Sequence, residues 1–200
     1  MSEGFKPILE VAQLMHGFPA PWFISGGWAI DLFVGEVTRP HSDIEIGIFR
    51  CDQRALWRQL PGWRFEKAVD SSAGGEWVSW EMHEELRLPV HQIKATRRDG
   101  EPAEIEFFLN ERSETHWISR RHAGLARAVS EAVFISALEV PALVPEIQLL
   151  FKAKYNRPKD RADFELALPR FDMMQRAWLA NALAEYHPGH AWIELIGEKT

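Results

Sequence analysis

Residues 43–49, DIEIGIF, alternate strictly between apolar and polar or small side chains, and this segment constrains the fold most. Successive side chains of a β-strand point to opposite faces. The three isoleucines therefore share one face, and Asp43, Glu45 and Gly47 share the other. The apolar face must be covered by other elements, so the segment predicts a strand in a sheet with one buried side. Gly47 leaves its polar face without a side chain at that point, which predicts room for a ligand.

A second alternating segment, AEIEFFL at residues 103–109, places Glu104 and Glu106 on one strand face. If this strand neighbours residues 43–49, three or four carboxylates converge. Close carboxylates repel one another, and a divalent cation or a shared proton relieves the repulsion. The alternative is a solvated strand face, which for Asp43 and Glu45 taken alone is the more common arrangement.

The segment before the first alternating strand has the order strand, glycine turn and helix. PWFIS at residues 21–25 predicts a short buried strand, and residues 28–34 predict a helix that stops at Gly35. Between them, Ser25, Gly26 and Gly27 would present backbone N–H groups at a helix N-terminus, a suitable seat for phosphate. The sequence is neither a Walker phosphate loop nor a G-x-G-x-x-G motif. A plain tight turn is the alternative.

The pattern changes to helices from about Pro141. One helix is expected from Pro145, and the pair Asp172 and Gln175 predicts a capping box that starts a later one. The expected fold class is α+β. Residues 1–140 would form an α/β core, a small mixed β-sheet flanked by helices, and residues 141–200 a helical C-terminal region packed on it. SSAGGEW, residues 71–77, is expected to be a loop.

The charge and cysteine content exclude several classes of protein. A net charge of −6 disfavours a nucleic-acid partner, because non-specific affinity for nucleic acid comes from Lys and Arg. Cys51 is the only cysteine, so neither an intramolecular disulfide nor a cysteine-based metal site is expected. No segment is apolar enough to span a membrane or resembles a signal peptide, which makes the cytoplasm the expected location. The oligomeric state stays open.

The segment GGWAIDLFVGEVTRPHSDIEI, residues 26–46, resembles the signature of nucleotidyltransferases with the DNA polymerase β-like fold. It is most similar to the aminoglycoside 2″-nucleotidyltransferases and lincosamide nucleotidyltransferases, including the interval from Gly27 to Asp43. A weaker similarity extends to PEIQLLFKAK and RPKDRADFE in the second half. Such a composite signature is far more specific than its separate pieces.

The resemblance implies roles for individual residues. Asp43 and Glu45 would ligate Mg²⁺, although Glu45 replaces the more common Asp. The third carboxylate would be Glu106, with Glu104 as the alternative. The predicted nucleotide-binding residues lie on the glycine turn, on the loop before residue 43, or on the helix expected from Pro145: Ser25, Gly26, Gly27, Arg39, His41, Lys152 and Lys154. Arg39 and His41 could equally be loop residues held by ordinary hydrogen bonds, and the two lysines could belong to a solvated helix face.

The resemblance also implies an activity. NMP, with AMP as the expected group, would pass from an NTP co-substrate to a hydroxyl of a small molecule, with two Mg²⁺ ions. The acceptor would be an aminoglycoside- or lincosamide-like antibiotic. Trp77, Trp80 and Glu84 are candidate walls of its pocket. Two alternatives are a toxin that modifies tRNA or protein, and an inactive domain that only binds nucleotide or a partner protein.

Overall fold

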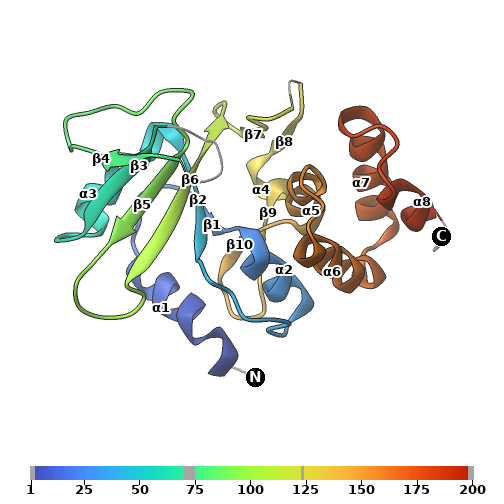
Figure 1. Cartoon of the computed structure of the whole chain (residues 1–200), viewed down its shortest axis with the longest axis horizontal. Coiled ribbons are helices and arrows are strands. Elements are labelled where there is room, and N and C mark those ends of the chain that lie inside the picture. Colours follow the sequence, from blue (N-terminus) through green and yellow to red (C-terminus); the bar gives the residue numbers. More distant parts are fainter. Residues whose placement is uncertain (1–2, 70–74, 123, 198–200) are drawn as a thin grey trace.

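The computed structural model describes residues 3–69, 75–122 and 124–197 of the chain. Their strands form a mixed sheet in the order β4-β3-β5-β6-β2-β1-β10-β9, with β7 and β8 branching from β6. The helices at the C-terminal end lie together beside one end of this sheet (Figure 1). The expected α+β class is thus confirmed. No helix in the described part of the chain is long and apolar enough to cross a membrane.

The strands and helices have the following bounds. The strands are β1 (Trp22–Ile24), β2 (Glu45–Phe49), β3 (Arg64–Ala68), β4 (Trp77–Ser79), β5 (Gln92–Thr96), β6 (Glu104–Arg112), β7 (His116–Ile118), β8 (Ala126–Ala128), β9 (Val133–Ile135) and β10 (Pro141–Leu143). The α-helices are α1 (Lys6–Leu14), α2 (Gly26–Val34), α3 (Ala55–Gln59), α4 (Val129–Ala132), α5 (Pro145–Ala153), α6 (Pro158–Ala167), α7 (Met173–Tyr186) and α8 (Trp192–Gly197).

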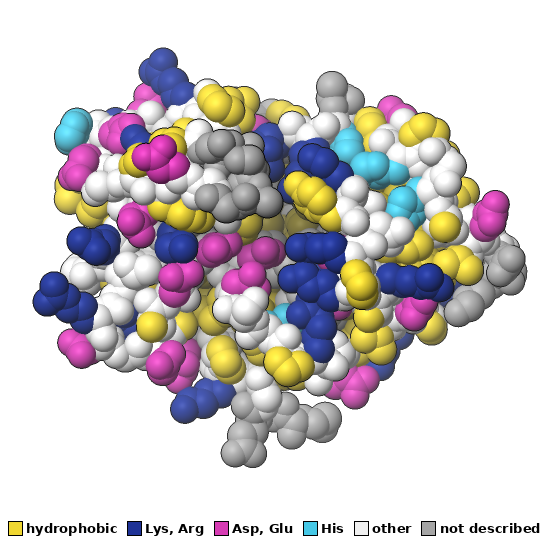
Figure 2. Space-filling model, in the orientation of Figure 1, with side chains coloured by type: hydrophobic (Ala, Val, Ile, Leu, Met, Phe, Trp, Pro, Cys, Tyr) yellow, Lys and Arg dark blue, Asp and Glu magenta, His cyan; other side chains and the backbone are white. Residues whose placement is uncertain are grey.

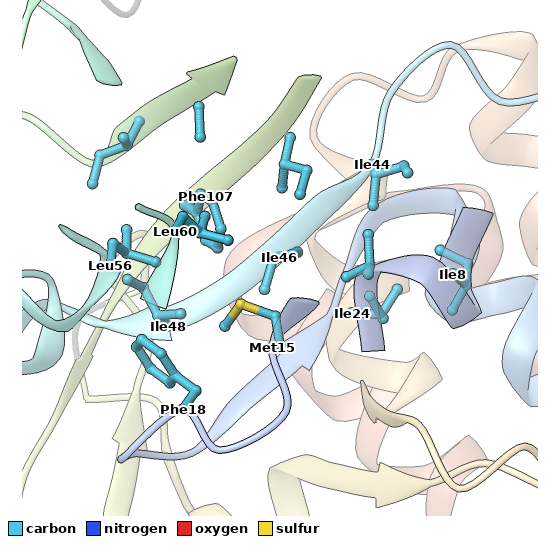
Figure 3. Close-up of a cluster of buried hydrophobic side chains, with 14 of the residues drawn as sticks. Ile8, Met15, Phe18, Ile24, Ile44, Ile46, Ile48, Leu56, Leu60 and Phe107 are labelled. Carbon is cyan, nitrogen blue, oxygen red and sulfur yellow. The ribbon is translucent and has the colours of Figure 1, made fainter. Parts of the chain in front are cut away.

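The apolar face of β2 is covered as its alternation predicts. Ile46 and Ile48 are fully buried in a cluster that also contains Met15, from the segment after α1, and Leu56 of α3 (Figure 3). Burying such side chains stabilises the fold by about 1.5–3 kcal/mol each. A charged residue at Ile46 would therefore break the contact between the sheet and its covering helices.

Helices α5 and α6 pack on α2, and α7 packs on α5. Ile30 and Val34 of α2 join a cluster with Leu149 of α5 and Phe164 of α6. Helix α2 ends at Gly35, whose φ of 84° is the left-handed conformation expected of a glycine cap. The site elements are thus fixed on both sides, by the sheet and by the C-terminal helices.

Two details differ from the sequence prediction. Pro141–Leu143 is a strand, β10, which pairs with β1 and β9. A proline can occupy the first residue of a strand, where its missing N–H is tolerated. The loop expected at residues 71–77 lies partly outside the described residues, and Trp77 already belongs to β4. The capping box of α7 is present, because Asp172 accepts a 2.8 Å bond from the Gln175 N–H.

Candidate functional site

The two carboxylate-bearing strands are direct neighbours. Strands β2 and β6 run parallel, and their register places Glu45 opposite Glu106. Asp43 lies two residues before Glu45, at the end of the loop that enters β2, and it is exposed. The arrangement expected from two separate sequence segments is therefore present in the sheet.

The carboxylates disturb one another's ionisation. Burial, and after it the charge of Asp43, raises the pKa of Glu45 from 4.5 to about 7; Lys152 lowers it, and Glu106 raises it further. Burial also raises the pKa of Glu106, which is lowered by a 2.8 Å hydrogen bond from Gln92 Nε2 and raised by Asp43. Strong perturbation in a hollow is typical of functional sites, although structural ion pairs also cause it.

Glu104 and Glu106 share a face of β6 but have different surroundings. Glu104 is exposed and lies 3.6 Å from the Lys94 ammonium group, which provides a counter-charge. Glu106 lies nearer the centre of the sheet, beside Glu45. Of the two glutamates, Glu106 is the one that the structure brings to the other carboxylates.

The glycine turn comes close to the carboxylates. Helix α2 begins at Gly26, whose φ of 68° favours glycine, and a Cβ atom there would collide with the Glu45 carboxylate. Two of the turn's N–H groups already have partners: Ser25 donates to the Glu45 carbonyl and Gly26 to Gln148 Oε1, both at 2.8 Å. The first N–H groups of a helix have no partner within it, which leaves the Gly27 N–H as the turn's donor toward a ligand.

The loop residues Arg39 and His41 differ in position. The Arg39 guanidinium binds Asp163 at 3.2 Å and lines the hollow beside the glycine turn. The His41 side chain is 2% exposed; it binds Asp31 at 2.6 Å and stacks on Trp28. His41 therefore holds the loop against α2, whereas Arg39 faces the site.

One expected opening is closed. The space above Gly47 is filled by the Phe23 ring, with which a Cβ at Gly47 would collide. The prediction that Gly47 leaves room for a ligand was wrong, because the neighbouring strand β1 pairs Phe23 with Gly47 and fills that space. Phe23 itself lines the hollow.

The cations opposite the carboxylates come mainly from the second half of the chain. Lys152 is buried and binds Asp163 at 2.8 Å, yet its charge still acts on Glu45. Lys154, the other predicted lysine, is exposed, stands 5.2 Å from the Tyr155 ring and does not line the hollow. Lys159 at the start of α6 does line it, and its charge also acts on Glu45. Lys159 was not among the predicted site residues, although the similarity of RPKDRADFE could have indicated it.

One pocket of about 260 Å³ is lined by Asp43, Glu45, the glycine turn, Arg39, Lys152 and Lys159, and Glu106 lies beside Glu45 outside that lining. Acidic side chains lie beside a column of basic ones near the centre of the molecular face in Figure 2. Several pocket residues were not assigned to the site by sequence reasoning. They lie on β6, after β7, on α5, in the connection from α5 to α6, or at the start of α6: Phe108, Asn110, Arg120, Arg121, Gln148, Phe151, Tyr155, Arg157 and Lys159. The segment after β7 carries no motif, so only the fold brings it here.

The proposed acceptor walls are not all at the surface. Trp80 is fully buried in the main core, where it contacts Trp57 and Phe65, so it cannot form a pocket wall. Glu84 is engaged with Lys67. Trp77 is half-buried, with the Lys94 ammonium group 4.5 Å from its ring centroid. None of the three candidates lines the pocket beside Asp43 and Glu45.

Comparison with known proteins identifies the family of the chain. Residues 7–166 match the aminoglycoside-2″-adenylyltransferase family. The chain belongs to this family. It is a nucleotidyltransferase, as the resemblance of residues 26–46 predicted. No curated protein matches its sequence closely enough to add a relative.

Solved structures share the nucleotidyltransferase fold. The crystal structure of the aminoglycoside enzyme ANT(2″)-Ia in complex with adenylyl-2″-tobramycin superimposes with a TM-score of 0.60 and 17% identity, covering 90% of this chain and 96% of that one. Lincomycin-bound lincosamide antibiotic adenylyltransferase LnuA gives a TM-score of 0.55 and 17% identity, over 80% of this chain and 94% of that one. Such low identities show the fold alone, so the substrates of this family member must be argued from its own pocket.

Proposed function

We propose that this family member transfers a nucleotidyl group from a Mg²⁺-bound NTP to a hydroxyl of a small antibiotic of the aminoglycoside or lincosamide class. AMP is the group named by the family. The observation that carries the proposal is the parallel register of β2 and β6, which sets Glu106 beside Glu45, while Glu45 lines the same pocket as the glycine turn.

Oxygen ligands of the kind that Mg²⁺ prefers are present. The carboxylates of Asp43 and Glu45 face the pocket, and the pKa of Glu45 is raised first by burial and then by the charge of Asp43. Among the described residues, no three His, Cys, Asp or Glu side chains already surround a point where an ion fits. Mg²⁺ is usually held by one or two carboxylates together with substrate phosphates, so this donor set fits an ion that arrives with the triphosphate.

In the proposed site, Asp43, Glu45 and Glu106 would hold Mg²⁺. Bound Mg²⁺ would supply positive charge at the phosphates and a template for orienting the acceptor hydroxyl. Glu106, whose raised pKa suits a base, takes the hydroxyl proton as the oxygen–phosphorus bond forms and pyrophosphate leaves.

The triphosphate would lie along the opposite wall. The Gly27 N–H and the N-terminal end of α2 favour negative charge there. Lys159 has no hydrogen bond or ion pair with the described residues and can bind a phosphate directly. Lys152 and Arg39 each form an ion pair with Asp163, so they would have to reorient to bind the phosphates. Ser25 lines the same wall, whereas we no longer propose Lys154 or His41 as direct contacts.

Two matched variants test the metal assignment. Glu106→Gln should reduce nucleotidyl transfer by at least about 100-fold, because the base and a metal ligand are lost. Glu104→Gln removes the same charge from the same strand face and should keep most of the activity. Equal losses in both variants, or full activity in Glu106→Gln, would contradict the assignment of Glu106.

The acceptor class is tested with labelled NTPs, Mg²⁺ and a panel of aminoglycosides and lincosamides. Mass spectrometry should find an antibiotic that has gained one NMP. Absence of transfer to every member, together with absence of Mg·NTP binding, would refute the proposed function.

A further inference from the structure

Helix α6 carries two buried carboxylates behind the positive wall of the pocket. Asp160 and Asp163 are three residues apart on α6, so they share one face of the helix, and their side chains are 0% and 1% exposed. A carboxylate is rarely buried so completely unless cations compensate its charge. Both residues belong to the segment RPKDRADFE, of which the proposed function uses Lys159 but neither aspartate.

The two aspartates have different partners. Asp160 accepts hydrogen bonds from the Arg157 backbone N–H at 3.0 Å and from Arg157 Nε at 2.7 Å, which closes the capping box of α6; the Lys152 ammonium group lies 3.4 Å away. The Asp163 carboxylate, among the described residues, is bound by Arg39 and by Lys152 alone. Asp160 therefore stabilises the start of α6, whereas the partners of Asp163 are pocket cations.

Asp163 joins cations from two distant parts of the chain. Arg39, from the loop before β2, donates from Nε and Nη2 to the two Asp163 oxygens at 3.2 Å, and Lys152, from α5, lies 2.8 Å from one of them. A guanidinium held at two points is fixed in orientation as well as in place. Both cations line the pocket, so a single buried carboxylate determines where two of the pocket's positive charges stand.

Arg39 is also held against the glycine turn. A Cβ atom at Gly27 would collide with the Arg39 guanidinium, so the missing side chain lets the arginine approach the N-terminal end of α2. The Gly27 N–H is the turn's donor toward a ligand, and a helix N-terminus favours an anion. Through Arg39, Asp163 therefore places a guanidinium beside the proposed phosphate seat.

We propose that Asp163 is a positioning residue for the triphosphate, which holds Arg39 and Lys152 where the phosphates bind without touching the substrate itself. This inference rests on the proposed function, because the phosphates of the NTP are the groups that these cations would contact. An ammonium group has three N–H donors and a guanidinium five, so each cation keeps a donor that its present partners do not use. Reorientation toward a phosphate then pivots on Asp163 and keeps both ion pairs. Protein kinases use such an arrangement, since their phosphate-binding lysine must be paired with a glutamate.

Titration calorimetry with Mg²⁺ and ATP, and separately with Mg²⁺ and inorganic tripolyphosphate, tests the inference. Asp163→Asn keeps the size of the side chain and should weaken both ligands about tenfold or more, because charge-assisted hydrogen bonds that place the cations are lost. Removing a negative charge would by itself strengthen phosphate binding, so a weakening reports the lost positions. Glu165→Gln is the matched control: it removes the same charge from an exposed residue of α6, which pairs with Arg161 at 2.8 Å, and should bind as the wild type does.

A double substitution separates positioning from a general effect on the fold. Arg39→Gln should also weaken both ligands. Combined with Asp163→Asn, it should lose less affinity than the product of the two single losses, because both substitutions disrupt the same arrangement. Independent structural damage would instead multiply the two losses. Melting temperatures without ligand identify a variant that has not folded.

The outcomes distinguish this inference from the proposed function. Tighter binding by Asp163→Asn would mean that Asp163 competes with phosphate for the cations, and unchanged binding would mean that their positions do not depend on it; either overturns the inference alone. If Asp163→Asn does not fold, a crystal structure of the wild type with Mg²⁺ and tripolyphosphate decides. Arg39 and Lys152 should then contact Asp163 and phosphate oxygens together, and a cation that has left Asp163 overturns the inference. Absence of ATP and tripolyphosphate binding by the wild type refutes the proposed function too.

Discussion

Glu45 should make the metal-free protein less stable at neutral and alkaline pH, so Glu45→Gln should stabilise it. The pKa of this carboxyl rises from 4.5 to about 7 on folding, first through burial and then through Asp43. One pKa unit corresponds to about 1.4 kcal/mol, so keeping the group charged above pH 7 costs up to about 3 kcal/mol of folding free energy. Water screens part of this cost, because the side chain is not fully buried, and we expect a gain of about 1–3 kcal/mol.

The stability gained by Glu45→Gln depends on pH. Below pH 4.5 the carboxyl is neutral in the folded and the unfolded state, so the substitution gains nothing. As the pH rises toward 7, the unfolded state loses its proton while the folded state keeps it, and the gain grows. Above pH 7 both states are charged, and the gain stays constant. For a chain of this size, it corresponds to an increase of about 2–10 °C in melting temperature.

Thermal unfolding in EDTA, followed by tryptophan fluorescence at pH 4.5 and pH 8, measures the effect. Glu104→Gln is the control, because Glu104 is exposed and paired with Lys94, and it should show no such gain. With Mg²⁺ and NTP added, the wild type should gain more stability than Glu45→Gln, which lacks the ligand. A loss of stability in Glu45→Gln at pH 8, or the same gain at both pH values, would refute the reasoning.

Three further predictions concern the entry to β2, the glycine turn and a group of histidines beside the end of α7. Asp43→Asn should abolish transfer while changing the free energy of unfolding by less than about 1 kcal/mol, because Asp43 is exposed; urea unfolding that shows a large loss would contradict this. Gly26→Ala should destabilise the protein by more than about 1 kcal/mol and weaken NTP binding, since its φ of 68° and its contact with Glu45 exclude a side chain; unchanged chemical unfolding would argue against that. Burial lowers the pKa of His122, His187 and His190, so the unfolded state takes up protons first, and stability should fall as the pH drops below about 6.5. A triple substitution of these histidines by Gln should flatten that part of the profile of melting temperature against pH, and an unaltered slope would contradict the assignment.

Much of the site near the carboxylates could be predicted because its signals are local. The alternation of residues 43–49 and 103–109 determines which side chains share a face, whatever the rest of the chain does. The Gly35 cap and the capping box at Asp172 likewise depend on a few neighbouring residues, and both are present. The composite signature at residues 26–46 indicated the family, which its separate motifs could not indicate.

Only the tertiary structure decided which carboxylate meets Glu45. Glu104 and Glu106 are equivalent by periodicity, and the parallel register of β2 with β6 distinguishes them, since register is set by packing across the sheet. The same holds for Gly47, whose open face is filled by Phe23 from β1. Arg120 is the clearest example of a pocket residue that the sequence alone does not predict. It stands in no motif, and it enters the pocket because β7 branches from β6, so its chemistry depends on neighbours that are distant in the chain.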